Sequence, residues 1–317
     1  MQTKQYSVAN TFGISAPNGL YVNGYDEGGP YVPDIDANYV FRREVLRDVL
    51  AWLEGSKGEG LYLTGPTGSG KSSVVIQVAA RLNLPLQPVA GNPRLEFADL
   101  VGQCQVIGGN TAFCPGPLAI AMKEGHLFLI DEIDLLDPAT SAGLNPIVDG
   151  SPLLIPQTGE LIKAHPHFRF VATGNTAGCG DSTGLYQGTL RQNLAFLDRF
   201  WMVRVDYPEP AVEKQVLERA TPQLPAMERE KMIEVANEIR RLFMGESDSP
   251  SAIEVTMSTR ALVRWAHLAL TFRGAALSYS LDRALTFRAQ PETRQAILQI
   301  VQRHFGDEAI EGPARTS

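Results

Sequence analysis

The sequence of 317 residues predicts an α/β fold with a parallel sheet in its first two thirds, followed by a smaller all-helical domain. Short apolar runs alternate with helical periodicities up to residue 206, which is typical of a parallel sheet covered by helices on both faces. Beyond that residue only helical periodicity continues. A hydrophobic fraction of 44% and a charged fraction of 20% fit a folded chain and argue against a disordered or fibrous one.

The first domain is expected to follow an N-terminal arm. Residues 1–38 are rich in Gly, Asn, Tyr and Pro without a sustained period, so we expect an extended arm there. Apolar residues then recur at helical spacing over residues 41–54, and Gly55 ends that helix. Strands are expected at 61–64, 86–89, 127–130 and 168–172, with helices between them. The α/β domain is therefore expected to span residues 39–206.

The second domain is expected over residues 207–317. It begins at the sequence YPEP, and its apolar residues follow helical periods at 227–243, 258–272 and 291–305. We find no convincing strand in this part of the sequence. The helical domain would therefore pack as a separate body after the sheet.

Charge, cysteine content and hydropathy argue against several classes of protein. Lys and Arg number 28 against 35 Asp and Glu, and this net charge of −7 is the wrong sign for a nucleic-acid partner. The three cysteines, Cys104, Cys114 and Cys179, have no CxxC spacing, which argues against a disulfide scaffold or structural zinc. No secretory leader or apolar stretch of about 20 residues is present, so we expect a cytoplasmic protein without a membrane partner.

Residues 65–72 read GPTGSGKS and match GxxxxGK[ST] between an apolar strand and an amphipathic helix. In this motif the glycines let backbone N–H groups face phosphate oxygens, and the helix N-terminus adds its positive dipole end. Lys71 would reach the terminal phosphates, and the Ser72 hydroxyl would bind magnesium. The residues expected to contact the nucleotide are Gly65, Pro66, Thr67, Gly68, Ser69, Gly70, Lys71, Ser72 and Ser73.

Residues 126–134 read HLFLIDEID, an apolar strand that delivers two adjacent carboxylates at its carboxyl end. Ligands of open α/β sheets bind at this end of the strands. In a nucleotide hydrolase Asp131 would hold magnesium, directly or through water, and Glu132 would polarise the attacking water. The sequence therefore predicts separate tasks for these two neighbouring carboxylates.

Three further polar side chains are candidates for the same site. Asn175 ends the apolar run FRFVATGNT and could orient the water, or could occupy an ordinary turn. Arg199, just before the domain boundary, could reach the γ-phosphate bound by a neighbouring subunit. Arg260 opens a helix of the second domain and could contact the same phosphates from its own subunit. Either arginine could instead be a surface side chain in an ion pair.

Together, the phosphate loop, the DE pair, the strand ending in Asn, the DRF sequence and the arginine of the helical domain resemble the AAA+ ATPases. More narrowly, the chain resembles the MoxR-type clade and, within it, the ATPase subunits of aerobic cobaltochelatase. The resemblance is densest in HPHFRFVATGNTAGCGDSTGLYQGTLRQNLAFLDRF and extends over residues 32–307. It implies a three-layer α/β/α P-loop domain with a helical lid, ATP and Mg²⁺ as cofactors, and a hexameric ring.

The resemblance also implies a role for each candidate residue. It assigns Lys71 and Ser72 to the Walker A motif, and Asp131 and Glu132 to the Walker B motif. It assigns Asn175 to sensor 1, Arg199 to the arginine finger and Arg260 to sensor 2. It further implies two insertions, one at residues 101–117 around Gly108 and Gly109 and one hairpin at residues 153–162.

Two functions stay open at this point. The chain could be a motor that hydrolyses ATP to remodel a partner, as in a cobaltochelatase complex. It could instead be a nucleotide-gated chaperone that assembles or activates a partner with a von Willebrand factor A domain. A DNA-acting ring ATPase is disfavoured by the negative charge.

Overall fold

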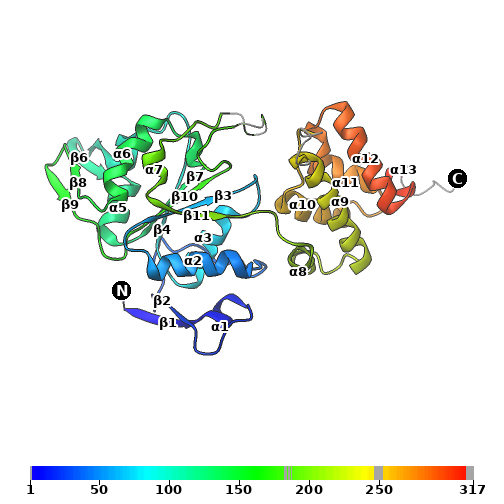
Figure 1. The fold of residues 1–317 in the computed structure, drawn as a ribbon, viewed down its shortest axis with the longest axis horizontal. Helices are drawn as coiled ribbons and strands as arrows, with labels where there is room; N and C mark the ends of the chain where they lie inside the picture. Colours follow the sequence, from blue (N-terminus) through cyan, green and yellow to red (C-terminus); the bar gives the residue numbers. More distant parts are fainter. Residues whose placement is uncertain (1, 182–183, 185, 187, 246–252, 312–317) are drawn as a thin grey trace. The chain divides into compact units, whose positions relative to one another are not determined.

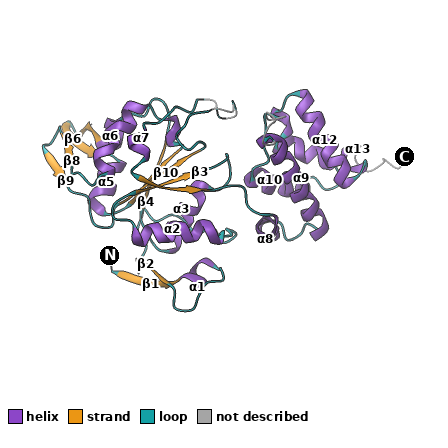
Figure 2. Ribbon diagram, in the orientation of Figure 1, coloured by secondary structure: helices purple, strands orange, loops and turns teal. Residues whose placement is uncertain are grey.

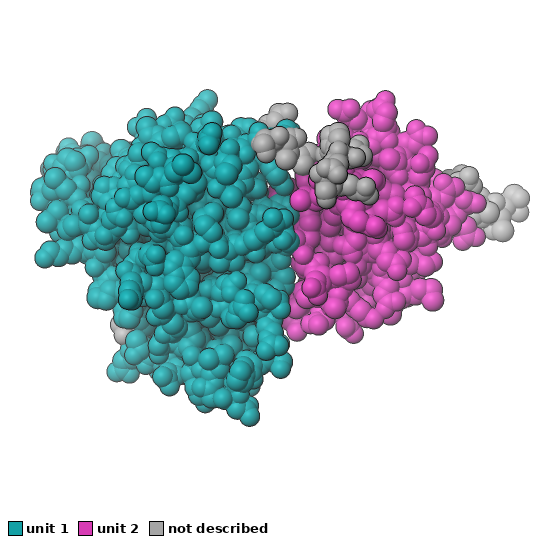
Figure 3. Space-filling model, in the orientation of Figure 1, with its two compact units in different colours: residues 1–37, 41–66, 70–206 teal, residues 38–40, 67–69, 207–317 magenta. Residues whose placement is uncertain are grey.

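A computed structural model describes residues 2–181, 184, 186, 188–245 and 253–311. The chain divides into two compact units (Figure 3). We call the first the α/β unit; it comprises residues 1–37, 41–66 and 70–206. We call the second the helical unit; it comprises residues 38–40, 67–69 and 207–317.

The α/β unit is built on a five-stranded parallel sheet (Figures 1 and 2). Its strands lie in the order β11-β3-β10-β7-β4. They are β3 (Gly60–Thr64), β4 (Leu86–Ala90), β7 (Leu127–Asp131), β10 (Arg169–Gly174) and β11 (Phe200–Arg204). The predicted parallel α/β sheet is thereby confirmed. Strand β11 is an addition that the sequence analysis did not identify, and it pairs with β3 at the edge of the sheet.

Helices cover both faces of this sheet, which gives three layers (Figure 1). One face carries α2 (Arg43–Gly55) and α3 (Lys71–Arg81), and the other carries α5 (Pro117–Glu124) and α6 (Pro138–Val148). Two short helices, α4 (Phe97–Val101) and α7 (Leu194–Leu197), and a 3-10 turn at Ile133–Leu135 complete the unit. Alternate strand side chains such as Phe128 and Phe170 enter the core on the α5–α6 face. The inner strands β3, β7 and β10 are buried on both sides, which explains their continuous apolar runs.

The N-terminal segment differs from the expected extended arm. It contains β1 (Thr3–Ser7), the short helix α1 (Val8–Phe12) and β2 (Tyr21–Tyr25), and the two strands pair antiparallel. The backbone N–H of Tyr25 donates to the carbonyl of Leu82 at 2.9 Å, which ties this hairpin to the end of α3. Strand β1 reads TKQYS and lacks an apolar run, so its pairing depends on these tertiary contacts.

Two further hairpins extend from the α/β unit where the resemblance places insertions. The first consists of β5 (Gly102–Ile107) and β6 (Asn110–Pro115), and the second of β8 (Leu153–Ile155) and β9 (Glu160–Ile162). Gly108 and Gly109 join β5 to β6 with φ angles of 59° and 84°, as a two-residue turn of type I′ requires. Apolar side chains on both hairpins are exposed, namely Val106, Ile107, Leu154 and Leu161.

In its described residues the helical unit contains helices and no strand. These are α8 (Pro210–Ala220), α9 (Ala226–Met244), α10 (Thr259–Thr271), α11 (Leu277–Ala284), α12 (Pro291–Phe305) and α13 (Glu308–Glu311), with a 3-10 turn at Thr286–Arg288. Trp265 of α10 and Ile239 of α9 are fully buried in its core. No helix in the described part of the chain is both long and apolar enough to cross a membrane.

A buried ion pair lies inside the helical unit. Arg240 of α9 and Glu213 of α8 share two hydrogen bonds of 2.7 Å, and both side chains are almost fully buried. The Arg240 Nε also donates to the carbonyl of Met257 at 2.7 Å, and the guanidinium lies 4.6 Å from the ring centre of Tyr207. These contacts join three segments of the unit around one charge pair.

Candidate functional site

Five of the predicted site residues gather at the carboxyl ends of β3, β7 and β10. The Lys71 Nζ donates to the Asn175 Oδ1 at 3.0 Å, and the Ser72 hydroxyl donates to the Asp131 Oδ1 at 2.5 Å. Glu132 follows Asp131 directly at the end of β7. We call Lys71, Ser72, Asp131, Glu132 and Asn175 the strand-end cluster. It joins residues at or just beyond the carboxyl ends of three strands, which lie far apart in the sequence.

The phosphate loop connects β3 to α3, which begins at Lys71 after Gly70 in a left-handed conformation with φ 92°. The Lys71 Nζ donates to the carbonyls of Gly65 and Pro66 at 2.8 and 3.0 Å, so the ammonium lies inside the loop. Gly65 cannot be replaced without a clash, because a Cβ there would lie 2.1 Å from the carbonyl oxygen of Val205. The loop therefore has the narrow, backbone-lined shape that suits phosphate oxygens.

Burial and neighbouring charges change the ionisation of two members of the cluster. Burial lowers the pKa of Lys71 to about 8, against the opposing influence of the carboxylates of Asp134, Asp131 and Glu132. Burial also raises the pKa of Glu132, and the charges of Asp131 and Asp134 raise it further. The raised pKa brings the Glu132 carboxylate closer to the range in which a general base works at neutral pH.

The donor set of the cluster fits a magnesium ion. Mg²⁺ prefers hard oxygen ligands and is usually held by one or two protein groups, with water and substrate phosphates in the other positions. The hydroxyl of Ser72 and the carboxylate of Asp131 lie beside each other and supply two such oxygens. No cluster of three His, Cys, Asp or Glu residues suited to a metal occurs among the residues that the structure describes.

Two residues that the sequence analysis did not single out hold the cluster in place. Thr173 of β10 donates its hydroxyl to the Asp131 carboxylate and accepts the backbone N–H of Glu132 at 3.2 Å. Asp134 is fully buried, and its Oδ2 accepts the backbone N–H groups of Asn175 and Thr176 at 2.8 and 2.9 Å. Both lie inside motifs that the sequence analysis quoted, HLFLIDEID and FRFVATGNT, but their contacts depend on the neighbouring positions of β7 and β10.

Glu132 itself has an unusual backbone. Its φ angle of 58° is left-handed, a conformation that non-glycine residues rarely adopt. Such strained residues concentrate at functional sites, where the surrounding structure holds them. Here the turn after β7 is held by hydrogen bonds of Thr173 and Asp134 that join the carboxyl ends of β7 and β10.

The two candidate arginines have different surroundings. Arg199 lies in the α/β unit, where its Nε and Nη2 donate to the two carboxylate oxygens of Asp149 at 2.7 and 2.8 Å. This fork holds the pKa of Arg199 above its ordinary value, chiefly through the hydrogen bond to Asp149. Arg260 lies in the helical unit, exposed in the first turn of α10, where Ser258 caps the helix.

Two sequence families match most of the chain. The family described as AAA domain (dynein-related subfamily) matches residues 60–200. The family described as CbbQ/NirQ/NorQ C-terminal matches residues 213–304. The first match covers the strand-end cluster and four of the five strands of the sheet, ending at the start of β11, and the second falls within the helical unit.

Three relatives are similar over nearly their whole length. Aerobic cobaltochelatase subunit CobS of a Sinorhizobium species is 32% identical over 317 residues, with 96% of this chain and 92% of CobS covered. Protein NorQ of Paracoccus denitrificans is 32% identical over 268 residues, with 83% of this chain and 88% of NorQ covered. Denitrification regulatory protein NirQ of Stutzerimonas stutzeri is 30% identical over 258 residues, with 81% of this chain and 87% of NirQ covered. With both family matches and these relatives in agreement, the chain belongs to the MoxR-type AAA+ ATPases.

Proposed function

We propose that this chain hydrolyses ATP to ADP and phosphate as a subunit of a ring, hexameric by the family resemblance, and uses the reaction to remodel a partner protein. The observation that carries the proposal is the strand-end cluster, in which Lys71 contacts Asn175 and Ser72 contacts Asp131. A lysine in a glycine loop, a hydroxyl, two carboxylates and an amide are the groups that phosphoryl transfer to water needs in one place.

In the proposed reaction, the phosphate loop positions ATP. Backbone N–H groups of the loop after Pro66, from Thr67 to Ser73, and the N-terminus of α3 bind phosphate oxygens, and the Lys71 ammonium neutralises charge on the terminal phosphates. Ser72 and Asp131 would hold Mg²⁺. When bound, the ion would offset the negative charge that develops on the phosphate oxygens.

The Glu132 carboxylate accepts a proton from water as the water oxygen attacks the γ-phosphorus, and the bond to the bridging oxygen of ADP breaks. Asn175 orients that water through its side-chain amide. Asp134 holds the backbone of Asn175, so we assign it a positioning role.

The two candidate arginines would neutralise the remaining negative charge on the phosphates. We assign Arg199 to the site of a neighbouring subunit as the arginine finger, and Arg260 to the nucleotide of its own subunit as sensor 2. In this arrangement Arg199 would exchange Asp149 for the γ-phosphate during each cycle. An isolated chain would lack the finger and should hydrolyse ATP slowly.

The test is a comparison of mass and ATPase rate across a protein concentration series, with ATP and magnesium. Rate per chain should rise with concentration as rings form. Glu132→Gln and Arg199→Ala should each lower the maximal rate by about 100-fold or more. Arg204→Ala, which removes an exposed arginine of β11 paired with Asp206, serves as the matched control and should keep the wild-type rate. A monomer with a flat rate per chain would contradict the ring and the role of Arg199.

We propose that the ring acts on its partner protein through the two inserted hairpins. Their exposed apolar side chains, Val106 and Ile107 on one and Leu154 and Leu161 on the other, are available to grip a protein partner. A cytoplasmic cobaltochelatase-like complex is the leading assembly, because CobS is matched over 96% of this chain. In such a complex the chain would be the motor.

A second function is favoured by the other relatives. NorQ is as similar as CobS in identity, at 32%, and NirQ carries the name of a regulatory protein. The chain would then be a nucleotide-gated chaperone that assembles or activates a partner with a von Willebrand factor A domain. Glu132→Gln separates the two functions, because it should bind ATP without cleaving it. A switch would still activate its partner in this variant, whereas a motor would not.

A further inference from the structure

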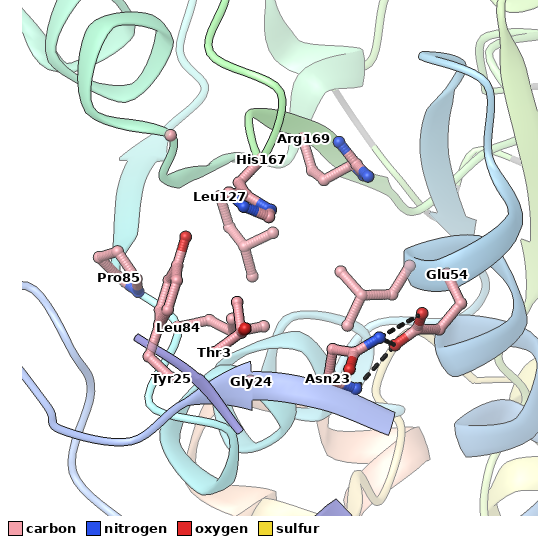
Figure 4. A pocket seen from close by; sticks show the side chains of 12 residues that line it. Thr3, Asn23, Gly24, Tyr25, Glu54, Leu84, Pro85, Leu127, His167 and Arg169 are labelled. Atoms are coloured by element: carbon pink, nitrogen blue, oxygen red, sulfur yellow. Dashed lines mark hydrogen bonds between the residues drawn. The ribbon is translucent and has the colours of Figure 1, made fainter. Parts of the chain in front are cut away.

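A cavity of about 370 Å³ lies in the α/β unit (Figure 4). It is at the amino ends of β7 and β10, whereas the strand-end cluster is at their carboxyl ends. Leu127 and Arg169, the first residues of β7 and β10, lie side by side in register on its wall. The hairpin β1–β2, the end of α2 and the turn before β4 form the remaining walls. The volume falls within the range of small-molecule sites, about 300–1,000 Å³.

One wall of the cavity carries the guanidinium of Arg169, which forms no ion pair with the residues that the structure describes. The Arg169 Nη1 donates to the carbonyls of Pro166 and Phe168, both at 2.8 Å. Its Nε is buried and has no hydrogen-bond partner among the described residues, and no described carboxylate lies within ion-pair distance. Burial lowers the pKa of Arg169, but a guanidinium stays protonated at physiological pH. A partly buried cation with an unsatisfied donor would be stabilised by an anion that enters the cavity.

His167 and Tyr25 lie beside this guanidinium. The two rings meet edge to face with centres 5.9 Å apart. Burial is the main cause that lowers the pKa of His167, so the imidazole is neutral at pH 7 and offers one N–H donor. An anion at Arg169 would therefore find a second donor next to it without a second full charge.

The Glu54 carboxylate of the same cavity favours the charged form of Arg169 but lies outside ion-pair distance. Glu54 is satisfied by Asn23, whose backbone N–H donates at 2.7 Å and whose side-chain amide donates at 3.2 and 3.0 Å to the two carboxylate oxygens (Figure 4). Between the two polar walls the cavity is lined by apolar side chains, namely Leu53, Leu84, Pro85 and Leu127. The lining therefore suits a ligand with an oxyanion at one end and an apolar body.

We propose that this cavity is a second binding site, separate from the nucleotide site, for a small organic oxyanion whose carboxylate or phosphate binds Arg169 and His167 and whose apolar body contacts Leu84 and Leu127. The guanidinium fork offers paired N–H donors to two oxygens of the anion. The apolar body is desolvated by the leucines.

The test is calorimetric titration of the full chain, saturated with ADP and magnesium so that the phosphate loop is occupied. Benzoate and phenyl phosphate present two oxyanions on one apolar body, and benzamide is their uncharged counterpart. At least one charged probe should bind with one site per chain and about tenfold or more tightly than benzamide. The preferred head group then distinguishes a carboxylate from a phosphate ligand. Repeating the titration with Lys71→Ala, in the absence of ADP, keeps the result independent of nucleotide binding.

Variants locate the site. Arg169→Gln should remove the preference for the charged probe, whereas Arg47→Gln, an exposed arginine of α2, should leave it unchanged. His167→Phe keeps the ring against Tyr25 but removes the donor, so affinity should fall about three- to tenfold with an unchanged melting temperature. This second variant decides the outcome if Arg169→Gln does not fold. Absence of binding, equal binding of benzamide, or affinity that neither variant changes would overturn the proposal.

Discussion

At the scale of single residues, the ammonium of Lys71 lies among buried groups and has a pKa of about 8, well below its ordinary value. A phosphate anion favours the charged form and should raise this pKa again. At pH 8, close to this pKa, Lys71 should be partly deprotonated in the free protein, so nucleotide binding should take up a fraction of a proton per chain. Calorimetry in buffers of different ionisation enthalpy measures this uptake.

The matched control for this proton uptake is Lys71→Arg. A guanidinium keeps its proton at pH 8, so the variant should bind nucleotide without uptake. Uptake should also shrink in the wild type toward pH 6, where Lys71 is already protonated in the free protein. Equal uptake by both proteins at pH 8 would show that another group supplies the proton site.

Asp134 is the second residue with a sharp prediction. Its carboxylate accepts hydrogen bonds from two partly buried backbone N–H groups and from the hydroxyl of Thr176. Asp134→Ala leaves these three donors without a partner, at a cost near the low end of about 1–3 kcal/mol each because they are only partly buried, so the free energy of unfolding should fall by about 3–5 kcal/mol. Asp137→Ala, which removes only the exposed cap of α6, should cost about 1 kcal/mol. Urea unfolding of both variants measures the difference. A similar loss of unfolding free energy in both would contradict the stabilising role assigned to Asp134.

The residues of the strand-end cluster could be predicted because each belongs to a motif that ends a strand. Thr173 and Asp134 could not be assigned in the same way, since a threonine within a strand and an aspartate in a turn have many ordinary uses. Their importance follows from the neighbouring positions of β7 and β10 in the sheet. The carboxylate that holds Arg199, Asp149, lies 50 residues away and carries no local signal either.

At the scale of elements, the ion pair of Arg240 and Glu213 joins α9 to α8 inside the helical unit. Removal of one partner leaves a buried charge, so Arg240→Met should lower the free energy of unfolding of this unit by about 3–5 kcal/mol. The double variant Arg240→Met, Glu213→Met removes both charges and should regain most of that loss. Hydrogen exchange of amides in α8 and α9 measures the stability of this unit by itself. A double variant as unstable as the single one would contradict this account.

Elements with a strong period were predictable, and those that depend on distant partners were not. Helices α2, α9, α10 and α12 coincide closely with the periodic segments, because one apolar face of each is buried. Strand β11 escaped notice because its five residues, FWMVR, follow directly on a motif read for its arginine. The β1–β2 hairpin was missed because β1 is polar and is held by the turn after α3.

At the scale of the whole molecule, the proposed ring makes each site depend on two subunits. Glu132→Gln chains keep Arg199, and Arg199→Ala chains keep Glu132. When the two inactive variants are mixed at equal amounts, about one site in four should combine both intact residues and recover about a quarter of the wild-type rate. Each variant alone stays inactive at every concentration. A mixture without activity, despite mixed rings by native mass spectrometry, would place Arg199 outside the neighbouring site.

The order of the central sheet also constrains how the protein is made. Strand β3 leads into the phosphate loop and leaves the ribosome early, yet its two neighbours, β10 and β11, are synthesised last among the strands of the sheet. Gly60 finds its partner Phe200 only after most of the α/β unit has emerged. Such non-local pairing is slow and leaves apolar strands open to aggregation during synthesis. A nascent chain that stops before Arg204 would therefore carry the complete GPTGSGKS sequence without a folded nucleotide site, and it would depend on chaperones until β11 arrives.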